Sequence, residues 1–436
     1  MSTKRLIDGL TKFDAAEMDK VFGGEHILRL SETSIHLAPI KRVAIIAEAF
    51  LPKVDGVSKS AYLTLRYLQQ TGREVIVFAP DISIANVGPS RVIALPALGM
   101  PFAPETRMAL PSLAVGRYLD SFKPDLIHMF SPAAMSVSGV LAGRRRHIPV
   151  IGNYQTDLPG YATKHYKMGV VGTLLKYWLR YVHNRCHLTL APSMYTLKEL
   201  RRDGYHRLRV WGRGVNAERF SPAHRSPERR AKLLNGRDPN SLLCLYVGRL
   251  AAEKRVDLLL DVARTPGVAL TVVGDGAARE ELERMFEGTD TQFTGYLYGE
   301  DLSHAYANSD AFLFAGQSET FGQVVQEAMS SGLPAVIINE GGITDLVQDG
   351  YNGFICPPDS QAFAKAVQTL QQNPALREEM SRNSRYITEQ RPWEAIMAQL
   401  EGYYEEAVEL NRRFNRIYHL STVSRRTLPT LVRLNR

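Results

Sequence analysis

The sequence predicts an α/β protein built from two successive Rossmann-like domains that face each other across a cleft. Short apolar runs typical of buried strands alternate with amphipathic stretches typical of helices. A polar and charged stretch at 222–239 interrupts this alternation, which then resumes. The length of 436 residues suits about two or three domains. Alternating strands and helices form parallel sheets, and ligands bind at the carboxyl ends of their strands.

The first half opens with a buried-strand pattern at Arg42–Ala49. A loop at 52–58 leads into a helix at 59–71, and the next strand is Glu74–Ala79. This unit lacks Gly-x-Gly-x-x-Gly, which argues against a nicotinamide site. The other elements expected here are strands at Asp125–Met129, Val150–Tyr154 and Leu188–Ala191, and helices ending near Arg146, spanning Val170–His187 and running from Pro192 to about Asp203.

The second half repeats the rhythm and ends in a long helix at Trp393–Leu410, which can reach back over the first domain. Expected strands are Leu242–Val247, Leu270–Val273, a short one at Phe293, Ala311–Phe314 and Ala335–Ile338. Expected helices are Val256–Arg264, Glu280–Phe286, Leu302–Asn308, Gly322–Ser330, Gln361–Gln371 and Leu376–Thr388. We therefore divide the chain into an N-terminal arm (1–40), a first domain (41–221), a second domain (222–392), the returning helix (393–410) and a basic tail (411–436).

Charge is unevenly distributed between the two halves. Residues 1–221 carry 30 Lys and Arg against 17 Asp and Glu, whereas residues 222–409 carry 16 against 28. The basic half suggests an anionic partner, such as a membrane surface, an acidic acceptor or nucleic acid, although solubility alone would also explain it. The expected helix at Val170–His187 combines aromatic and basic residues, which suits either a lipid interface or a core-facing aromatic stripe.

The remaining composition favours a reducing compartment. Three widely spaced cysteines predict neither a disulfide framework nor a zinc site. Residues 1–10 lack the apolar core of a signal peptide. We therefore expect a cytoplasmic protein.

Two carboxylates, Glu319 and Glu327, have seven residues between them, the first after a strand and the second within a helix. The backbone amides of Thr320, Phe321 and Gly322 would lie at the start of that helix, where phosphate binds readily. Carboxylates suit hydroxyl groups instead. The combination predicts a nucleotide-sugar, with Glu319 on the sugar and Glu327 on the ribose. The simpler explanation of the pair alone is two glutamates on a solvated helix.

Two cations, Arg249 and Lys254, follow the strand Leu242–Val247 and could neutralise a departing diphosphate. The sequence has no Asp-x-Asp, so we expect no divalent metal and no other cofactor. It also lacks a P-loop and a Gly-x-Ser-x-Gly elbow. Gly56 could let the backbone approach a phosphate closely, although a plain turn explains it equally well.

These motifs together resemble the retaining glycosyltransferases of family 4, which have the GT-B fold. The resemblance covers residues 42–410 and rests on Gly248-Arg-Leu-Ala-Ala-Glu-Lys, Val273-Gly-Asp-Gly, Arg213-Gly-Val-Asn, Gly341-Gly and the Glu319/Glu327 pair. It implies transfer with retained anomeric configuration and without a metal. In the first lobe it places Gly56 near the phosphates.

The resemblance also implies roles for residues of the second domain. Arg249 and Lys254 would hold the donor diphosphate, and Glu319 would hold the transferred sugar. Substrate binding is implied as well for Asp275, Thr320, Phe321, Gly322 and Glu327.

Two positions depart from the family pattern. Gln155 stands where many members have His, and Asn216 replaces the usual Asp of the linker motif. Glutamine is no base at neutral pH but can orient hydroxyls. The Gln155-Thr-Asp-Leu-Pro-Gly-Tyr form resembles bacterial mannosyltransferases that build glycolipids and, more distantly, sulfoquinovosyldiacylglycerol synthases. Asp157 is the candidate for contact with the acceptor, and we count it with the catalytic residues.

The expected function is metal-independent, retaining transfer of a hexosyl group from GDP-mannose or a UDP-hexose to a lipid acceptor. The enzyme would lie peripherally at the inner face of the membrane and would not bind nucleic acid. One alternative is the same transfer to a soluble saccharide. Another is a non-catalytic nucleotide-sugar binding protein. An oxidoreductase ranks last, because Gly274-Asp-Gly is only a fragment of a dinucleotide fingerprint.

Overall fold

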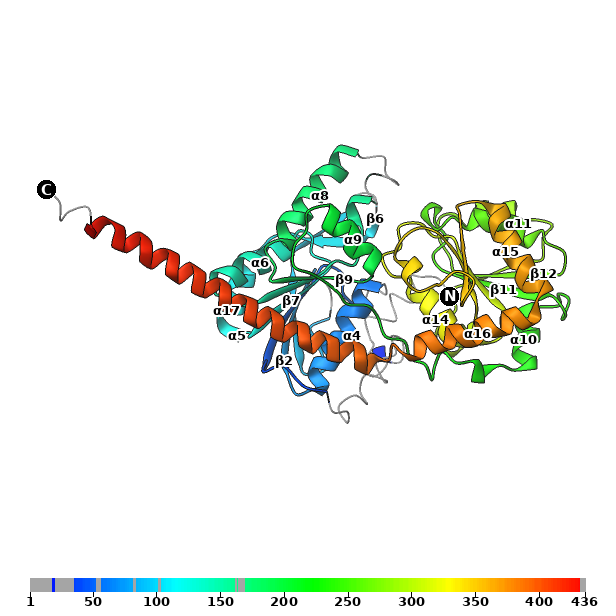
Figure 1. The fold of residues 1–436 in the computed structure, drawn as a ribbon, viewed down its shortest axis with the longest axis horizontal. Helices are drawn as coiled ribbons and strands as arrows, with labels where there is room; N and C mark the ends of the chain where they lie inside the picture. Colours follow the sequence, from blue (N-terminus) through cyan, green and yellow to red (C-terminus); the bar gives the residue numbers. More distant parts are fainter. Residues whose placement is uncertain are drawn as a thin grey trace.

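The computed structural model describes residues 18–19, 35–51, 56–80, 84–100, 103–160, 163 and 169–431. Two α/β lobes lie side by side, and one long helix runs along the first of them and then away from it (Figure 1). Most of the N-terminal arm, at 1–17 and 20–34, lies outside the described residues, as do Asp55 and Tyr161 of two predicted loops.

The first lobe is organised around an eight-stranded sheet in the order β10-β9-β8-β7-β1-β2-β4-β3. All its strand pairs are parallel except β3 with β4. The strands are β1 (Arg42–Ala47), β2 (Glu74–Pro80), β3 (Asn86–Val87), β4 (Ser90–Leu95), β7 (Leu126–Phe130), β8 (Val150–Asn153), β9 (Leu188–Ala191) and β10 (Leu208–Val210); a separate hairpin joins β5 (Ala97–Met100) to β6 (Ala103–Ala109). The central strands are buried throughout, which explains their continuous apolar sequence.

Helices cover both faces of this sheet (Figure 1). They are α4 (Gly56–Gln70), α5 (Ala114–Phe122), α6 (Ser136–Arg145), the single turn α7 (Leu158–Gly160), α8 (Gly169–His183) and α9 (Met194–Arg202). Helix α8 ends four residues before the predicted boundary at His187. The amide of His187 donates to the carbonyl of Val150 instead, at 2.7 Å, so the chain has already turned toward β9.

The second lobe contains a six-stranded, all-parallel sheet in the order β13-β12-β11-β14-β15-β16. Its strands are β11 (Leu242–Val247), β12 (Val268–Val273), β13 (Thr291–Gly295), β14 (Ala311–Phe314), β15 (Ala335–Ile338) and β16 (Gly353–Cys356). Its helices are α10 (Pro227–Leu234), α11 (Leu260–Ala263), α12 (Arg279–Met285), α13 (Gly299–Ala307), α14 (Gln323–Ser330), α15 (Ser360–Gln372) and α16 (Pro374–Glu389), with 3-10 turns η3 (Pro222–His224), η4 (Ala252–Lys254), η5 (Val256–Leu259) and η6 (Gly342–Asp345).

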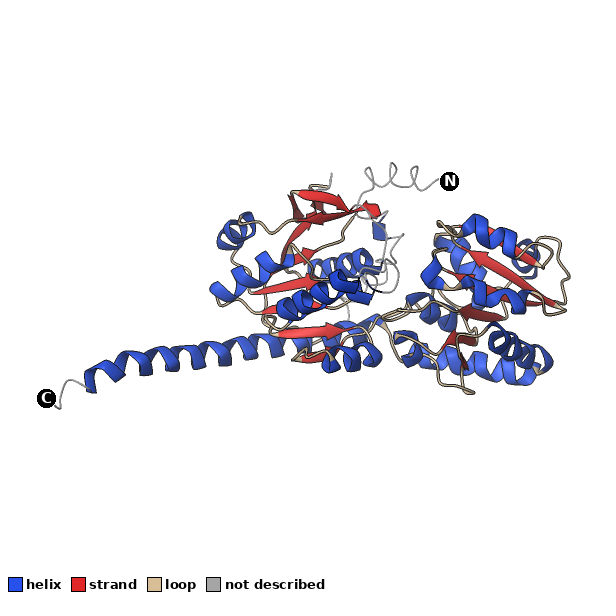
Figure 2. Cartoon of the chain, turned by 90° about the horizontal axis from the view of Figure 1, so that it is seen from above, coloured by secondary structure: helices blue, strands red, loops and turns tan. Residues whose placement is uncertain are grey.

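The final helix, α17 (Trp393–Leu431), continues well past its predicted end at Leu410, so most of the predicted basic tail is helical. Its first part packs into the core of the first lobe through apolar side chains such as Met397 and Leu400. Buried Glu401 fixes this contact, because both its oxygens pair with Arg73 at 2.7–2.8 Å. The distal part projects away from the body (Figure 2).

Candidate active site

The site is built where β11, β12 and β14 end, at the carboxyl edge of the second sheet. The loops after β11 and β12 are in direct backbone contact. A Cβ on Gly274 would lie 1.8 Å from the carbonyl oxygen of Gly248, and one on Gly276 would lie 2.2 Å from that of Leu250. Both glycines also have positive φ, of 139° and 158°. The two loops therefore fit together only with glycine at these positions, which sets Arg249 beside Asp275.

Both predicted cations are paired with carboxylates at this edge. Lys254 is 13% exposed and forms an ion pair with Glu319, which comes from the loop after β14. Arg249 is 54% exposed and pairs with Glu253, which is almost buried. Predicted Arg249, Lys254 and Glu319 are thus brought together by the fold. A diphosphate entering here would meet two cations whose positions are already fixed by acidic neighbours.

The loop from Glu319 to Gly322 leads into α14 and is packed against η6. A Cβ on Gly322, whose φ is 88°, would come within 2.3 Å of Ile343. Within the part of the chain that the structure describes, the backbone amides of Thr320, Phe321 and Gly322 donate no hydrogen bond. Three free backbone N–H groups before a helix form a suitable binding site for phosphate or sugar oxygens.

The Thr320 hydroxyl has a different partner. It donates to the carbonyl of Gln155 in the first lobe, at 2.7 Å. The carbonyl of Thr320 in turn accepts from the hydroxyl of Thr196, at 3.2 Å. Phe321 is buried, and its ring lies 3.5 Å from a Cβ built on Gly212. The loop whose backbone amides are candidates for binding the nucleotide-sugar is therefore also a contact between the lobes.

Glu327 lies on α14 and is 5% exposed. One of its oxygens lies 3.3 Å from the ammonium of Lys59 in the first lobe, and the other accepts from the Tyr306 hydroxyl at 3.4 Å. Burial and the nearby Glu327 hold the pKa of Tyr306 far above its usual range, so this hydroxyl stays a donor. Lys59 was not predicted from the sequence, where its one signal was its place in the first turn of the helix that follows β1.

Gln155 and Asp157 follow β8 in the first lobe and differ in the hydrogen bonds that their side chains make. The Gln155 side chain is 9% exposed, and neither atom of its amide has a partner among the residues described. Asp157 accepts from the amide of Gly160 at 3.0 Å and from the Tyr154 hydroxyl at 3.3 Å. Asp157 thus closes a local turn, whereas Gln155 has unused hydrogen-bonding capacity.

Two further predicted residues have clear surroundings. Asp275 accepts from the amide of Gly276 at 2.7 Å and from Arg279 at 3.2 Å, which fixes its carboxylate at the rim. Gly56 begins α4, and a Cβ there would meet no atom of the described residues within 4 Å. The open space suits a phosphate but does not require glycine.

One acidic residue at the carboxyl edge of the first sheet was not anticipated. Glu48 directly follows β1, and one of its oxygens accepts from the amides of Ala133 and Ser136, at 3.0 and 2.8 Å. Burial raises the pKa of this carboxyl despite those hydrogen bonds. A single charged residue near the end of the apolar run Arg42–Ala49 was the signal that could have identified it.

Helix α8 carries an exposed apolar surface. Its members, called the α8 stripe below, are Val170, Val171, Leu174, Tyr177, Trp178 and Tyr181, each at least 40% exposed. Arg180 lies 4.8 Å over the ring of Tyr177 and Arg185 lies 3.5 Å over that of Tyr181. The alternative of a core-facing aromatic stripe is therefore wrong. None of the helices in the described ranges has the length and apolarity to cross a bilayer.

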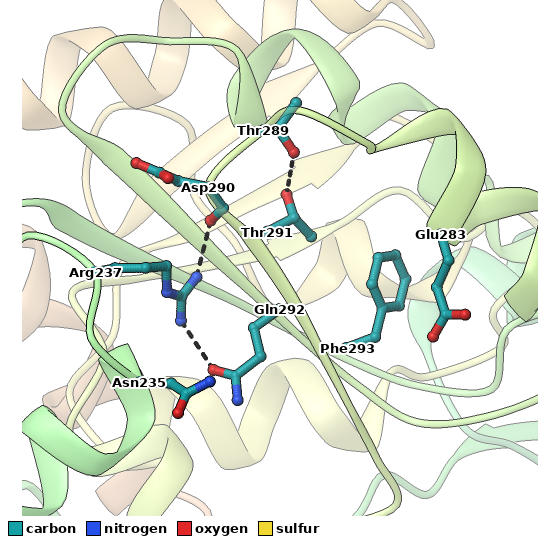
Figure 3. A pocket seen from close by; sticks show the side chains of 8 residues that line it. All are labelled: Asn235, Arg237, Glu283, Thr289, Asp290, Thr291, Gln292 and Phe293. Atoms are coloured by element: carbon teal, nitrogen blue, oxygen red, sulfur yellow. Dashed lines mark hydrogen bonds between the residues drawn. The ribbon is translucent and has the colours of Figure 1, made fainter.

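A shallow pocket of about 400 Å³ lies elsewhere, along the edge strand β13 (Figure 3). It is near the amino end of that strand, whereas the site lies at the carboxyl ends. Its cation, Arg237, donates to the carbonyls of Leu270 and Asp290 and to the side chain of Gln292, at 2.7–3.2 Å. Arg237 thus links β12 to β13 at the sheet edge through its hydrogen bonds.

Two family models match most of the chain. Residues 54–219 match the model described as Glycosyltransferase Family 4, and residues 228–386 match Glycosyl transferases group 1. A GDP-mannose-dependent alpha-mannosyltransferase of Mycobacterium tuberculosis is 36% identical over 84% of this chain and 96% of the relative. One of Corynebacterium glutamicum is 34% identical over 85% and 90%. A sulfoquinovosyl transferase of Arabidopsis thaliana is 33% identical over 84% and 74%.

Solved structures show the same fold at lower identity. A sucrose-phosphate synthase from Thermosynechococcus elongatus aligns over 87% of this chain and all of its own, with 20% identity and a TM-score of 0.65. WaaG, a glycosyltransferase of lipopolysaccharide biosynthesis, aligns over 83% of this chain and 99% of its own, with 16% identity and a TM-score of 0.64. The two-domain architecture predicted from the sequence is confirmed.

Proposed function

This chain belongs to glycosyltransferase family 4 and has the GT-B fold, and on that premise we propose that it transfers mannose from GDP-mannose to a lipid acceptor. The transfer retains the anomeric configuration and needs no metal ion. The observation that carries the proposal is the meeting of Arg249, Lys254 and Glu319 beside three free backbone amides.

In the proposed reaction the two cations bind the diphosphate, which departs with two negative charges. The bond between the sugar C1 and the diphosphate oxygen breaks. A new bond forms between C1 and the acceptor oxygen on the same face, and the acceptor proton passes to the released phosphate oxygen. Glu319 accepts hydrogen bonds from sugar hydroxyls and fixes the ring. The protein thus supplies position and charge stabilisation.

Asp275 supports guanine as the donor base. Its carboxylate stands at the rim beside Arg249, and a carboxylate is an acceptor only. Guanine offers two adjacent N–H donors to such a group, whereas uracil offers one N–H between two carbonyl oxygens that the carboxylate repels. Three relatives at 34–36% identity are GDP-mannose-dependent, which agrees with this preference.

The α8 stripe supports a lipid acceptor. Exposed aliphatic and aromatic side chains next to arginines suit the boundary between headgroups and acyl chains. The basic first lobe would be attracted to an anionic membrane surface. We therefore place the enzyme peripherally at the inner face of the membrane, with the first lobe toward the bilayer.

The test is a turnover assay of the full chain in the presence of a chelator. GDP-mannose, UDP-glucose and UDP-sulfoquinovose are offered with vesicles of anionic or neutral diacylglycerol lipids. We expect mannosyl transfer from GDP-mannose alone, to lipid. Transfer only to a soluble saccharide would contradict the lipid acceptor, and stimulation by added metal after chelation would contradict metal independence. Binding without any transfer or hydrolysis would overturn the enzyme assignment for this site.

The α8 stripe is tested separately by vesicle co-sedimentation. The double variant Leu174→Ser/Tyr177→Ser should bind anionic vesicles about tenfold more weakly, because it removes buried apolar area at the interface. Tyr386→Ser is the matched control, since this tyrosine is 59% exposed on the second lobe. Equal binding by both variants would contradict the proposed membrane surface.

A further inference from the structure

We infer that Lys59 of the first lobe completes the donor site of the second lobe. It holds the Glu327 carboxylate ready for the ribose hydroxyls, and so makes donor affinity depend on the closed arrangement of the lobes. The inference rests on the proposed function, because it takes Glu327 as the ribose contact.

The ion pair crosses the lobe boundary at low exposure. Lys59 and Glu327 are 268 residues apart in sequence, yet the ammonium lies 3.3 Å from the carboxylate. The side chains are 27% and 7% exposed, so water screens the pair only partly. Removing one partner would leave a nearly buried charge, and such losses are costly.

The carboxylate retains capacity for a ligand. Its two contacts, with Lys59 and Tyr306, are long at 3.3 and 3.4 Å. An ionised carboxylate can accept about four hydrogen bonds. Two loose contacts hold Glu327 in place and leave acceptor sites for a diol. This is what a carboxylate that receives ribose hydroxyls requires.

Lys59 moves with the first lobe because α4 is firmly anchored there. The helix buries Ala61, Leu65 and Leu68 in the core of that lobe. Any opening of the cleft that carries α4 away from α14 must break the contact with Glu327. A bound donor would favour the closed arrangement, since only that arrangement presents a fully oriented carboxylate.

A structural tie between the lobes is the competing explanation for Lys59. A simple tie would affect stability and lobe closure but not donor binding by molecules that are already closed. A positioning role predicts a selective effect on donor affinity, reversed by another cation. The two explanations therefore differ in measurable ways.

The experiment measures GDP binding by calorimetry and the separate KM and kcat values for GDP-mannose. Lys59→Met should raise the dissociation constant and KM about tenfold and change kcat at most about twofold. Lys59→Arg should restore most of the affinity. Lys365→Met is the control, since this lysine is exposed on α15. Glu327→Gln and the double variant Lys59→Met/Glu327→Gln complete a cycle, in which the two losses should not add.

A second readout follows the distance between the lobes. Fluorophores on Leu113→Cys and Lys365→Cys label selectively, because native Cys186, Cys244 and Cys356 are all buried. Lys59→Met should lengthen the mean distance without donor, and saturating donor should restore it. Normal affinity in Lys59→Met, or additive losses in the cycle, would overturn the inference. Failure of the wild type to bind GDP, or no effect of Glu327→Gln, would instead overturn the proposed donor site.

Discussion

The carboxylate of Asp345 in the second lobe accepts a hydrogen bond of 3.1 Å from the backbone amide of Tyr195 in the first lobe. The same oxygen also accepts from the amide of Met194. These amides open helix α9, whose own cap, Ser193, accepts from Thr196. A negative charge from one lobe thus stabilises a helix start in the other.

We predict that Asp345→Ala lowers the free energy of unfolding by about 1 kcal/mol, because two first-turn amides lose their acceptor. Urea unfolding of the full chain measures this loss. Glu287→Ala, at an exposed position of the second lobe, is the control and should change stability by less than about 0.5 kcal/mol. Equal stability of the two variants would show that the cap contributes nothing.

The two diphosphate candidates should affect catalysis strongly and to a similar extent. Arg249→Ala and Lys254→Ala should each lower kcat/KM about 10²- to 10³-fold, because a cation is removed from the leaving group. Arg249→Ala also removes the partner of Glu253, whose side chain is 9% exposed, so its thermal midpoint should fall as well, and activity is compared at a temperature where every variant is folded. Arg382→Ala, at a site 67% exposed on α16, is the matched control. Near-normal turnover of either active-site variant at saturating donor would exclude the diphosphate role.

Gln155 should show opposite effects on stability and activity. Its amide is buried without a partner among the described residues, which is unfavourable in the empty site. Gln155→Leu should therefore raise the free energy of unfolding by about 1 kcal/mol. It should also lower activity at least about tenfold, because a substrate hydroxyl loses its partner. Melting curves measure the change in stability, and initial rates measure the change in activity.

Gln326→Leu provides the contrast for that variant. Gln326 is fully buried and donates to the carbonyl of Arg213 at 2.8 Å. Its replacement leaves that carbonyl without its donor and should lower stability. If Gln155→Leu lost stability to the same extent, the Gln155 amide would have partners in solution and would not be waiting for a ligand.

Buried histidines should make stability depend on pH. Burial lowers the pKa of His128 to about 4 and that of His183 to about 3, against 6.5 when unperturbed. As the pH falls below about 6.5 the unfolded chain takes up protons first. Stability therefore falls toward pH 4 by up to about 1.4 kcal/mol per pH unit for each histidine, and it is constant above about pH 6.5.

Urea unfolding at about pH 7.5, 6 and 5 measures this slope. His128→Gln should make the dependence shallower, since one such group is removed. The exposed His206→Gln should leave it unchanged. A slope that is the same in wild type and His128→Gln would mean that His128 can take up a proton in the folded state.

Much of the fold was predictable because strands of parallel sheets are buried on both faces. The strand Leu242–Val247 was predicted with its observed bounds, since every residue in it is apolar and buried. The hairpin β5–β6 was not anticipated. Leu98 and Met108 within it are exposed, so its pattern does not resemble that of a core strand. The polar stretch at 222–239 likewise concealed α10, whose start is set by the Ser226 cap rather than by an apolar face.

The candidate site was predictable within the second lobe, because its residues follow strand ends that meet at one edge. The contacts between the two lobes were not predictable from the sequence. The contact of Lys59 with Glu327 depends on how two separately folded sheets are oriented, and no local sequence pattern records that orientation. The Gln155 amide, which has no partner among the described residues, could not be predicted for the same reason, since its burial depends on the whole folded chain.

The described part of the chain passes between the lobes twice, once before Phe220 and once where α16 ends and α17 begins. The two passages touch, because a Cβ on Gly214 would lie 2.6 Å from the Trp393 indole. Two connections at one place act as a single pivot, so the lobes separate by rotation and not by translation. Displacement then grows with distance from the pivot, as along a lever arm. A side chain at position 214 would push the two connections apart. The small rotation that results at the pivot would produce a larger displacement at the far end of the cleft.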